Sequence, residues 1–276
     1  MTARGPLLGS LLAVALLVAA CAGTSPSPRP VQSTTGGAIQ PAPAARLTIY
    51  AASSLKSALM KVETAVAGQF ELTISTDSST ALEAKIEQGA PADVFLSADT
   101  ANPQKLVDKG LAAGTVVTFA GNLLTVIVPK ANPAAIRSPA DVAKPGVKII
   151  AAATGVPIQK YADKLVANLA KESGYPAGFA TAYAANVISR EDNVGAVASK
   201  ISLGEGDAAI VYATDAKAWD NIATVAVPAD ANVPATYGGV VVLGSTNQAA
   251  ADGFLAWLAG PDGRAILATF GFLPAP

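Results

Sequence analysis

From residue 47 onward, short runs of apolar residues alternate with longer stretches in which apolar positions recur every three or four residues. Short runs bounded by turn residues predict strands, and the longer periodic stretches predict helices. Strands are expected at 47–50, 72–75, 94–96, 123–128, 148–152 and 208–212. Regular alternation of the two kinds of element is typical of an α/β fold with largely parallel sheets.

The predicted helices have recognisable starts and stops. Pro157 opens one helix, in the first turn, where a missing N–H has no consequence. Another carries the apolar stripe of 194–201 and stops at Gly204. The last begins near Asn247, a good N-cap, and ends at the Gly-Pro-Asp-Gly sequence of 260–263. No internal repeat is visible, and the length fits two α/β lobes of unrelated sequence.

Two hydroxyl-rich turns run directly into helical patterns. One is Tyr-Ala-Ala-Ser-Ser-Leu at 50–55 and the other is Thr-Asp-Ser-Ser-Thr-Ala-Leu at 76–82. The start of a helix leaves about four N–H groups without intrahelical partners and carries roughly half a positive charge, so it attracts anions. Either turn alone reads as an ordinary helix cap. Together they predict two facing seats for a small dianion.

Composition excludes several kinds of chemistry. The chain has no histidine and a single cysteine, Cys21, so a Ser-His-Asp triad, a Cys-His pair and a His- or Cys-ligated zinc site are all ruled out. We therefore expect a protein that is not an enzyme, without a cofactor and without a free metal cation. Lys and Arg number 19 against 20 Asp and Glu, and aromatic residues make up 5%. These scattered charges and few aromatics argue against binding of nucleic acid.

The first residues have the pattern of a bacterial export signal. Arg4 precedes an apolar stretch at 7–17, and Val-Ala-Ala-Cys at 18–21 resembles a lipobox. We expect a lipoprotein signal peptide at 1–21 with lipidation at Cys21. The alternatives are an ordinary secretory signal with an accidental cysteine, or a short membrane span, for which the apolar run is too short. Residues 22–45 are rich in Pro, Ser, Thr and Gly and predict a flexible tether. The protein is then extracytoplasmic, anchored to the cell membrane by its lipid.

Six segments of the folded body, taken in order, resemble the periplasmic molybdate-binding proteins, the substrate-capture component of molybdate ABC importers. Each segment alone is a weak signal, but six in order over residues 46–273 make a chance match improbable. They are YAASSL at 50–55, IEQGAPADVFLSAD at 86–99, GNLL at 121–124, EDNV at 191–194, IVYATDA at 210–216 and FGF at 270–272.

The resemblance implies the type II periplasmic-binding-protein fold, in which two α/β lobes are joined by two crossover strands and hold the ligand between them. Crossovers are expected near 123–128 and 237–243. Lobe one is then expected at 46–124 plus 238–276, and lobe two at 125–237. The implied function is capture of molybdate, or of tungstate, by a monomer that delivers it to an ABC permease and its ATPase.

Site residues follow from the same resemblance, position by position. Donors of the first lobe are expected at Ser54 and Ser79, with Ser53 and Ser78 as second choices. Those of the second lobe are expected at Ile158, Asn193 and Tyr212, the first two through backbone N–H groups. Ile158 stands where family members often have a small residue, and Asn193 stands where an apolar residue is frequent. Backbone donation tolerates both differences.

Three alternative functions stay open on the sequence alone. One is a sulfate or phosphate receptor of the same fold: a sulfate site differs from a molybdate site mainly in cavity size, and a phosphate site needs an acceptor for the phosphate proton. Asp77 and Asp192, near the predicted loops, are candidate acceptors for a protonated phosphate. A carboxylate-dependent extracellular hydrolase would use Asp93 or Asp192 instead. The third alternative is a surface adhesion or scaffold protein.

Overall fold

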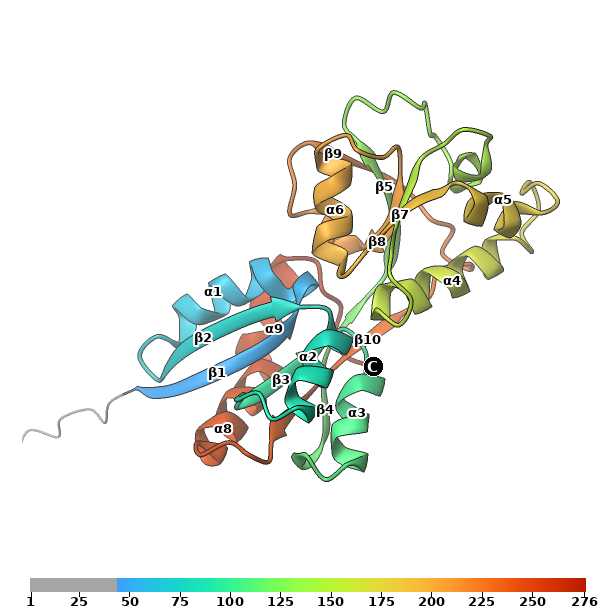
Figure 1. Cartoon of the computed structure of the whole chain (residues 1–276). Coiled ribbons are helices and arrows are strands. Elements are labelled where there is room, and N and C mark those ends of the chain that lie inside the picture. Colours follow the sequence, from blue (N-terminus) through green and yellow to red (C-terminus); the bar gives the residue numbers. More distant parts are fainter. Residues whose placement is uncertain (1–43) are drawn as a thin grey trace, which may run out of the picture. The chain divides into compact units, whose positions relative to one another are not determined.

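The computed structural model describes residues 44–276, so the predicted signal peptide, Cys21 and nearly all of the predicted tether lie outside the described residues. The described part contains two groups of strands with helices packed on each (Figure 1). We call them lobe one and lobe two. The chain leaves the sheet of lobe one at Asn122 and returns to it at Ala235.

Lobe one is built on a five-stranded sheet in the order β2-β1-β3-β10-β4. The strands are β1 Ala45–Ala52, β2 Phe70–Asp77, β3 Val94–Ser97, β4 Ala112–Asn122 and β10 Ala235–Val242. The helices are the 3-10 turn η1 Ser53–Leu55, α1 Lys56–Val66, α2 Ser79–Glu87, α3 Ala101–Asp108, α8 Gln248–Ala259 and α9 Pro261–Thr269. α1, α8 and α9 pack together on one face, and α2 with α3 covers a smaller apolar cluster on the other.

Lobe two has a three-stranded sheet, β8-β5-β9, and a two-stranded sheet, β6-β7. A bridge between Ile149 and Ala208 links them. The strands are β5 Leu124–Pro129, β6 Ile149–Ala152, β7 Val187–Glu191, β8 Ala209–Tyr212 and β9 Ile222–Val225. The helices are η2 Pro139–Ala143, α4 Pro157–Leu169, α5 Phe179–Ala185, α6 Val194–Ser202 and α7 Ala213–Ala216. α6 lies on one side of the strands, with α4 and α5 on the other (Figure 1).

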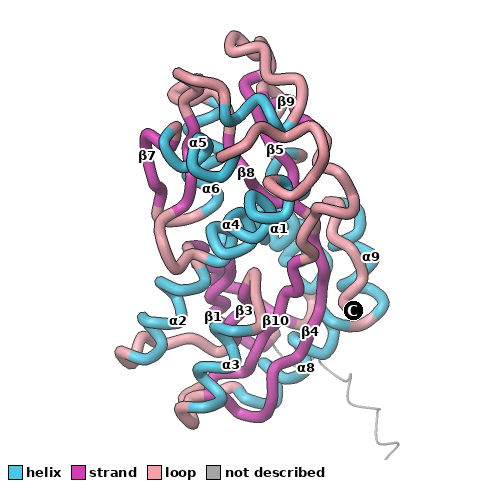
Figure 2. Tube along the Cα trace, turned by 90° about the vertical axis from the view of Figure 1, so that its right-hand side faces the viewer, coloured by secondary structure: helices cyan, strands magenta, loops and turns pink. Residues whose placement is uncertain are grey.

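The expectation of largely parallel sheets is only partly right. β1 runs parallel to β2 and β3, and β6 runs parallel to β7. β10, however, is antiparallel to both β3 and β4, and β5 is antiparallel to β8 and β9. The physical reason is that β10 enters the first sheet on its way back from lobe two, so it runs against β1 and β3. β4 and β10 lie side by side along their length (Figure 2).

The predicted strands and helices lie close to their predicted positions, but the segment that returns from lobe two to lobe one differs from the predicted one. All six predicted strands are present, and α4, α6 and α8 begin within a residue of their predicted starts. The lobe boundaries at 124/125 and 237/238 stay a prediction, while the chain leaves β4 at Asn122 and enters β10 at Ala235. The returning connection is 226–234, whereas 237–243, the stretch expected to cross, belongs mostly to β10 in the sheet of lobe one.

A cluster of aromatic rings fills the space where the two lobes join. Tyr237 of β10 is its centre, fully buried. Its ring centroid lies 5.6 Å from that of Tyr212 in lobe two and 5.3 Å from that of Phe272, both edge to face. Such edge-to-face pairs add roughly 0.5–1.5 kcal/mol each beyond the burial of their surface. The apolar core is therefore continuous through the junction, and the residues beside it are held firmly.

Gly121 shows why the junction needs a glycine. Its N–H donates to the carbonyl of Leu273, and the Leu273 N–H donates back to the carbonyl of Gly121. A Cβ at position 121 would lie 2.9 Å from the carbonyl oxygen of Pro274, a distance that real Cβ contacts do not reach. The C-terminal segment can therefore pair with the end of β4 only because position 121 has no side chain, and this pairing fixes the neighbouring Asn122.

Lobe two contains a carboxylate that makes folding pH-dependent. The Asp141 carboxylate accepts hydrogen bonds from the N–H groups of Arg137 and Ser138 and pairs with Lys144. Partial burial acts to raise the pKa of Asp141, but these contacts outweigh it and lower the pKa from 3.8 to about 2. A folded pKa below the unfolded one means that the stabilisation is present above about pH 4 and is lost as the pH falls toward 2.

Asp141→Asn is accordingly expected to lower the free energy of unfolding at pH 7 by about 1–2 kcal/mol, an estimate discounted for the exposed lysine partner. The difference between variant and wild type should shrink steadily between pH 4 and pH 2. Urea unfolding at several pH values measures it, with Asp252→Asn, an exposed position of α8, as the control. A difference that stays constant over this pH range would contradict the assignment.

Candidate functional site

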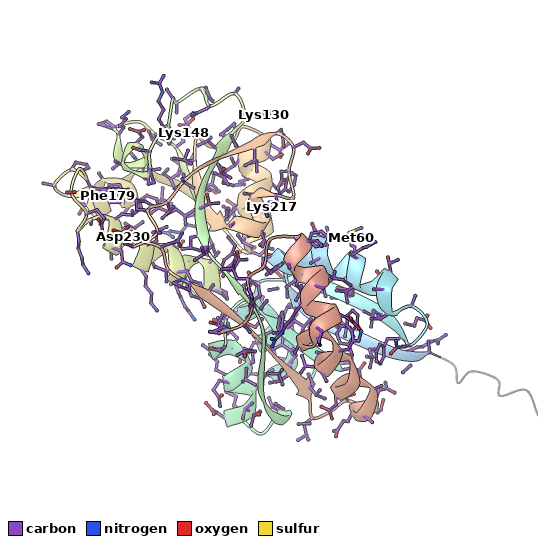
Figure 3. The ribbon with its side chains drawn as sticks, turned by 180° about the vertical axis from the view of Figure 1, so that it is seen from behind. Met60, Lys130, Lys148, Phe179, Lys217 and Asp230 are labelled. Atoms are coloured by element: carbon purple, nitrogen blue, oxygen red, sulfur yellow. The ribbon has the colours of Figure 1, made fainter. Side chains whose placement is uncertain are left out.

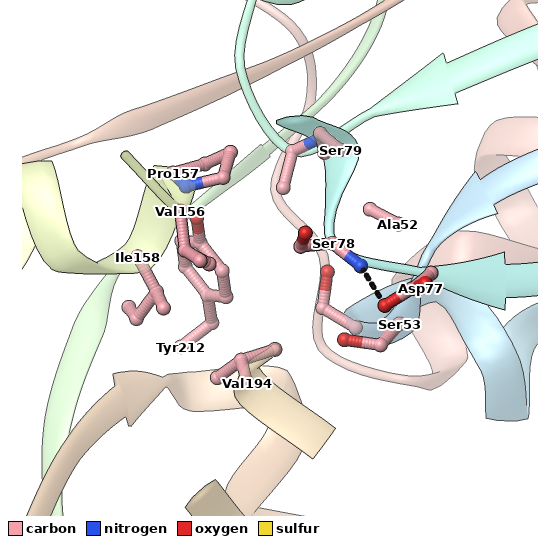
Figure 4. A pocket seen from close by; sticks show the side chains of 12 residues that line it. Ala52, Ser53, Asp77, Ser78, Ser79, Val156, Pro157, Ile158, Val194 and Tyr212 are labelled. Atoms are coloured by element: carbon pink, nitrogen blue, oxygen red, sulfur yellow. Dashed lines mark hydrogen bonds between the residues drawn. The ribbon is translucent and has the colours of Figure 1, made fainter. Parts of the chain in front are cut away.

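A small cavity lies where the two lobes meet, and the starts of four helical segments line it. The cavity volume is about 10 Å³, room for the centre of roughly one water-sized sphere. Its walls come from η1 and α2 of lobe one and from α4, α6 and the end of β8 in lobe two (Figure 4). The lining residues are Ala52, Ser53, Ser54, Asp77, Ser78, Ser79, Ala98, Val156, Pro157, Ile158, Val194 and Tyr212.

The first wall comes from the turn after β1. The chain leaves the sheet at Ala52 and enters η1, which places Ser53 and Ser54 at the cavity. The Ser54 hydroxyl is hydrogen-bonded to the Tyr237 hydroxyl at 2.9 Å, inside lobe one. The Ser53 hydroxyl accepts a hydrogen bond from the Gly195 N–H of lobe two at 3.3 Å. The turn therefore reaches both into its own lobe and across to the other one.

The second wall is the start of α2. Ser78 is the N-cap, and its hydroxyl accepts from the N–H of Ala81 at 3.2 Å. Ser79, the first helical residue, is almost fully buried, and its hydroxyl accepts from the N–H of Ala98 at 3.0 Å. The first N–H groups of α2 have no intrahelical acceptor because the helix begins here. This wall thus offers both hydroxyl and backbone donors.

Two helices of lobe two form the opposite wall. α4 starts with Pro157, which has no N–H, so Ile158 supplies the first free N–H of that helix. α6 starts at Val194, after the N-cap Asn193. Both helices exceed two turns, so their peptide dipoles add partial positive charge at the cavity. Figure 4 shows Val156, Ile158 and Val194 facing the serine turns of lobe one.

Tyr212 closes the cavity at the end of β8. Its side chain is 1% exposed, and its hydroxyl oxygen has no hydrogen-bond partner among the described residues. Burial, followed by the neighbouring Tyr237, raises the pKa of Tyr212 well above its usual value, so the hydroxyl keeps its proton. A buried hydroxyl without a partner costs about 1–3 kcal/mol. This donor is therefore well suited to meet an acceptor that enters the cavity.

The lining contains one charged side chain, Asp77, which is already engaged. One carboxylate oxygen accepts from the N–H of Ser78 at 2.8 Å and from the Asn193 amide at 3.3 Å, and the other pairs with Lys85 at 3.1 Å. Partial burial acts to raise the pKa of Asp77, but the contacts with Ser78, Lys85 and Asn193 outweigh it and lower the pKa. The carboxylate is therefore ionised at neutral pH.

Cationic side chains are absent from this lining, which lies wholly within the described residues. Lys130 and Lys148, for example, lie at the end of lobe two that is remote from lobe one (Figure 3). The described residues also include no group of three or more Cys, Asp or Glu side chains that could hold a metal ion. Apart from the Asp77 carboxylate, which is paired with Lys85, a ligand in the cavity meets neutral N–H and O–H donors and the partial positive charge of the helix starts.

Three hydrogen bonds join the lobes around the cavity. They connect Gly195 with Ser53, Asn193 with Asp77, and the Thr80 hydroxyl with the carbonyl of Gly155 at 2.8 Å. The two walls are thus in direct contact at the rim. A ligand held here would be shielded from water, which strengthens every hydrogen bond made to it.

The structure brings most of the expected site residues together. Ser54, Ser79, Ile158, Tyr212 and both second choices, Ser53 and Ser78, line the one cavity. Asn193 does not line it, and the next residue does. The side-chain oxygen of Asn193 accepts from the N–H of Ala196 to cap α6, and its amide donates to Asp77, so Val194 takes the place at the wall.

The apolar residues of the cavity wall were not predicted from the sequence. Ala52, Ala98, Val156 and Val194 contribute surface rather than donor side chains. The available signal was position, since Val194 directly follows an N-cap and is therefore the first residue of its helix. Asp192 does not line the cavity. It lines an adjoining depression, which shares Asp77, Ser78 and Val156 with the cavity. Asp93 serves the fold, because its carboxylate accepts from the N–H of Thr48 at 2.7 Å.

Residues 47–273 match the model of the bacterial extracellular solute-binding proteins. The molybdate-binding protein ModA of Mycobacterium tuberculosis H37Rv is 32% identical over 272 residues, which cover 96% of this chain and 97% of the relative. Because the matched family consists of binding proteins, the prediction that the chain is not an enzyme is confirmed, and a carboxylate-dependent hydrolase is no longer an alternative.

Among the described residues, no helix has the length and apolar character needed to cross a membrane.

Solved structures give the same fold. The periplasmic molybdate-binding protein of Azotobacter vinelandii matches with a TM-score of 0.71 at 24% identity, covering 82% of this chain and 98% of that one. The sulfate-binding protein SubI of M. tuberculosis matches with a TM-score of 0.72 at 22% identity, covering 83% and 87%. The predicted type II periplasmic-binding-protein fold is thereby confirmed. The chain belongs to the bacterial extracellular solute-binding proteins, in the branch whose curated relatives are the ModA substrate-binding components of ABC transporters.

Proposed function

We propose that this protein captures molybdate, or tungstate, as a fully deprotonated tetrahedral dianion in the cavity between its lobes. The single observation that carries this proposal is that the polar lining is set up to donate. The hydroxyls of Ser53, Ser78 and Ser79 each already accept an N–H from the protein. A hydroxyl has one hydrogen, and on these three serines it remains available for a ligand. The ligand that fits is one with acceptors only.

Neutral donors are sufficient to hold such an ion. Hydrogen bonds to an ionised acceptor are roughly twice as strong as those between neutral groups. The starts of α2, α4 and α6 add N–H groups and the positive ends of helix dipoles. The unpartnered hydroxyl of Tyr212 gains its missing partner from the same ion. Desolvation of the dianion is thus offset without a lysine or an arginine.

Phosphate is disfavoured because it retains a proton near neutral pH and then needs an acceptor. The one carboxylate in the lining, Asp77, already receives hydrogen bonds from Ser78 and Asn193 and pairs with Lys85. Sulfate, by contrast, has acceptors only and differs from molybdate in size. Support for molybdate over sulfate comes from the relatives, since the 32% identical ModA covers almost the whole chain, whereas the sulfate-binding neighbour shares only the fold.

The proposed setting is outside the cytoplasm. Lipidation at Cys21, with residues 22–45 as a tether, would keep the binding body near the membrane, where an ABC permease and its ATPase receive the ion. This part of the proposal rests on the sequence pattern of 1–45 and on the family, because residues 1–43 lie outside the described ones.

Calorimetric titration of the chain without residues 1–21 tests the proposed ligand. Molybdate and tungstate are expected to bind at least about a hundredfold more tightly than sulfate, which corresponds to about 2.7 kcal/mol. Phosphate should bind more weakly than sulfate at pH 8. Equal affinities for all four ions, or no heat with molybdate and tungstate, would overturn the proposal. A clear preference for sulfate would favour the second candidate, a sulfate receptor.

A further inference from the structure

A chain of buried hydrogen bonds runs from the lobe junction to the cavity. It passes through Asn122, Tyr237 and Ser54, which are 1%, 0% and 8% exposed. The Asn122 amide lies 3.3 Å from the Tyr237 hydroxyl, and this hydroxyl lies 2.9 Å from that of Ser54. Only Ser54 lines the cavity. Asn122 and Tyr237 do not line it, and the hydrogen bond that links them to the lining is the one to Ser54.

The direction of every bond in this chain is determined by the chemistry of Asn122. Its side-chain oxygen accepts from the N–H of Leu123 at 3.0 Å, which fixes which end of the amide is the nitrogen. The nitrogen has two hydrogens, and it donates them to the Thr214 hydroxyl at 2.8 Å and to Tyr237. An amide nitrogen cannot accept. The Tyr237 hydroxyl must therefore be the acceptor of the bond from Asn122.

Tyr237 then has one hydrogen to give, and the described residues offer it one acceptor, Ser54. Burial above all raises the pKa of Tyr237 well above its usual value, which keeps that hydrogen in place. The Ser54 oxygen accepts from Tyr237, so its own hydrogen is left for the cavity. The order of donation is Asn122 to Tyr237 to Ser54 to ligand.

We infer that Asn122 and Tyr237 are positioning residues for anion binding, which orient the Ser54 hydroxyl so that it presents a hydrogen, never a lone pair, to the bound ion. This inference rests on the proposed function, because it requires an anion in the cavity. Hydrogen bonds in a chain also polarise one another, so each donor strengthens the next. A fully deprotonated oxyanion gains from this arrangement, since every lone pair turned toward it would repel it.

A double-mutant cycle separates an action through Ser54 from a general structural effect. Tyr237→Phe is expected to weaken molybdate binding about fivefold in the otherwise unmodified chain, as expected for one buried hydrogen bond. In the Ser54→Ala background the same change should have less than a twofold effect, because the hydroxyl on which it acts is gone. Equal effects in both backgrounds would overturn the inference.

Asn122→Asp provides a second variant with a larger effect. A carboxylate at position 122 accepts from Tyr237, so Tyr237 becomes the acceptor for Ser54, and Ser54 turns a lone pair toward the ion. Molybdate affinity should fall at least about thirtyfold, and by much less in the Ser54→Ala background, where only the added charge acts. A loss of the same size in both backgrounds would mean that charge alone is responsible and would contradict the orientation argument.

A control variant, together with the calorimetric titration of the unmodified chain with the four oxyanions, distinguishes failure of the proposed function from failure of this inference. Tyr183→Phe, on α5 in lobe two, alters a buried tyrosine outside the cavity lining and should leave affinity unchanged. Circular dichroism and thermal unfolding establish that each variant is folded. If the unmodified chain binds none of the four oxyanions, the proposed function and this inference fall together. If it binds molybdate and the cycle is additive, the inference alone falls.

Discussion

Replacement of Ser54 and Ser79 together by alanine is expected to weaken molybdate binding by between roughly a hundredfold and ten-thousandfold. Each hydroxyl would donate to an ionised acceptor, and such a bond contributes about 1.5–3 kcal/mol. The two residues lie on opposite turns of lobe one, η1 and the start of α2, and both line the cavity. Calorimetry on the double variant and on each single variant measures the loss.

Stability should fall only modestly in the same variant. Ser54 loses its bond with Tyr237, and the N–H of Ala98 loses the Ser79 hydroxyl, which together cost about 1–3 kcal/mol of unfolding free energy. Ser202→Ala is the matched control, because its hydroxyl bonds Asn221 on the surface of lobe two. Unchanged molybdate affinity in a folded Ser54→Ala, Ser79→Ala variant would show that the cavity is not the binding site.

Tyr212→Phe should separate affinity from stability. Its hydroxyl has no hydrogen-bond partner among the described residues, so the change removes a buried polar group and leaves no protein group unpaired. The free energy of unfolding without ligand is expected to stay the same or to rise by up to about 1 kcal/mol. Molybdate affinity is expected to fall about ten- to a hundredfold, because one charge-assisted donor is lost.

Tyr237→Phe is the matched variant for Tyr212→Phe, because the Tyr237 and Tyr212 ring centroids lie 5.6 Å apart in the same aromatic cluster. The Tyr237 hydroxyl has partners in Asn122 and Ser54, so its removal should destabilise the unliganded protein by about 1 kcal/mol. Urea unfolding and calorimetry on both variants give the two quantities. A Tyr212→Phe variant that is clearly less stable and binds molybdate normally would mean that the hydroxyl serves the fold.

Local signals account for what the sequence could predict of the site. Ser54 and Ser79 could be found because a hydroxyl at the start of a helix is a pattern within a few residues, and so is Pro157 ahead of Ile158. Asn193 was predicted from the family resemblance as a backbone N–H donor, yet its side chain caps its own helix and Val194, the next residue, lines the wall. The apolar side chain of Val194 does not itself indicate a functional N–H, so only its position directly after an N-cap could have shown it.

Features that depend on distant segments could not be predicted in this way. The direction of β10 depends on the return of the chain from lobe two, and a strand's direction in a sheet leaves no mark in its own residues. The contact between Asn122 and Tyr237 joins positions 115 apart in the sequence. Nor does the sequence show that the Tyr212 hydroxyl lacks a partner, because that depends on everything packed around it.

The most direct test is a crystal structure grown with molybdate, with the molybdenum located by its anomalous scattering. One strong peak is expected in the cavity, with the ion's oxygens about 2.7–3.1 Å from the hydroxyls of Ser54, Ser79 and Tyr212 and from the N–H groups of Ile158 and Val194. A molybdenum peak elsewhere, or an ion held by lysine or arginine side chains, would contradict it.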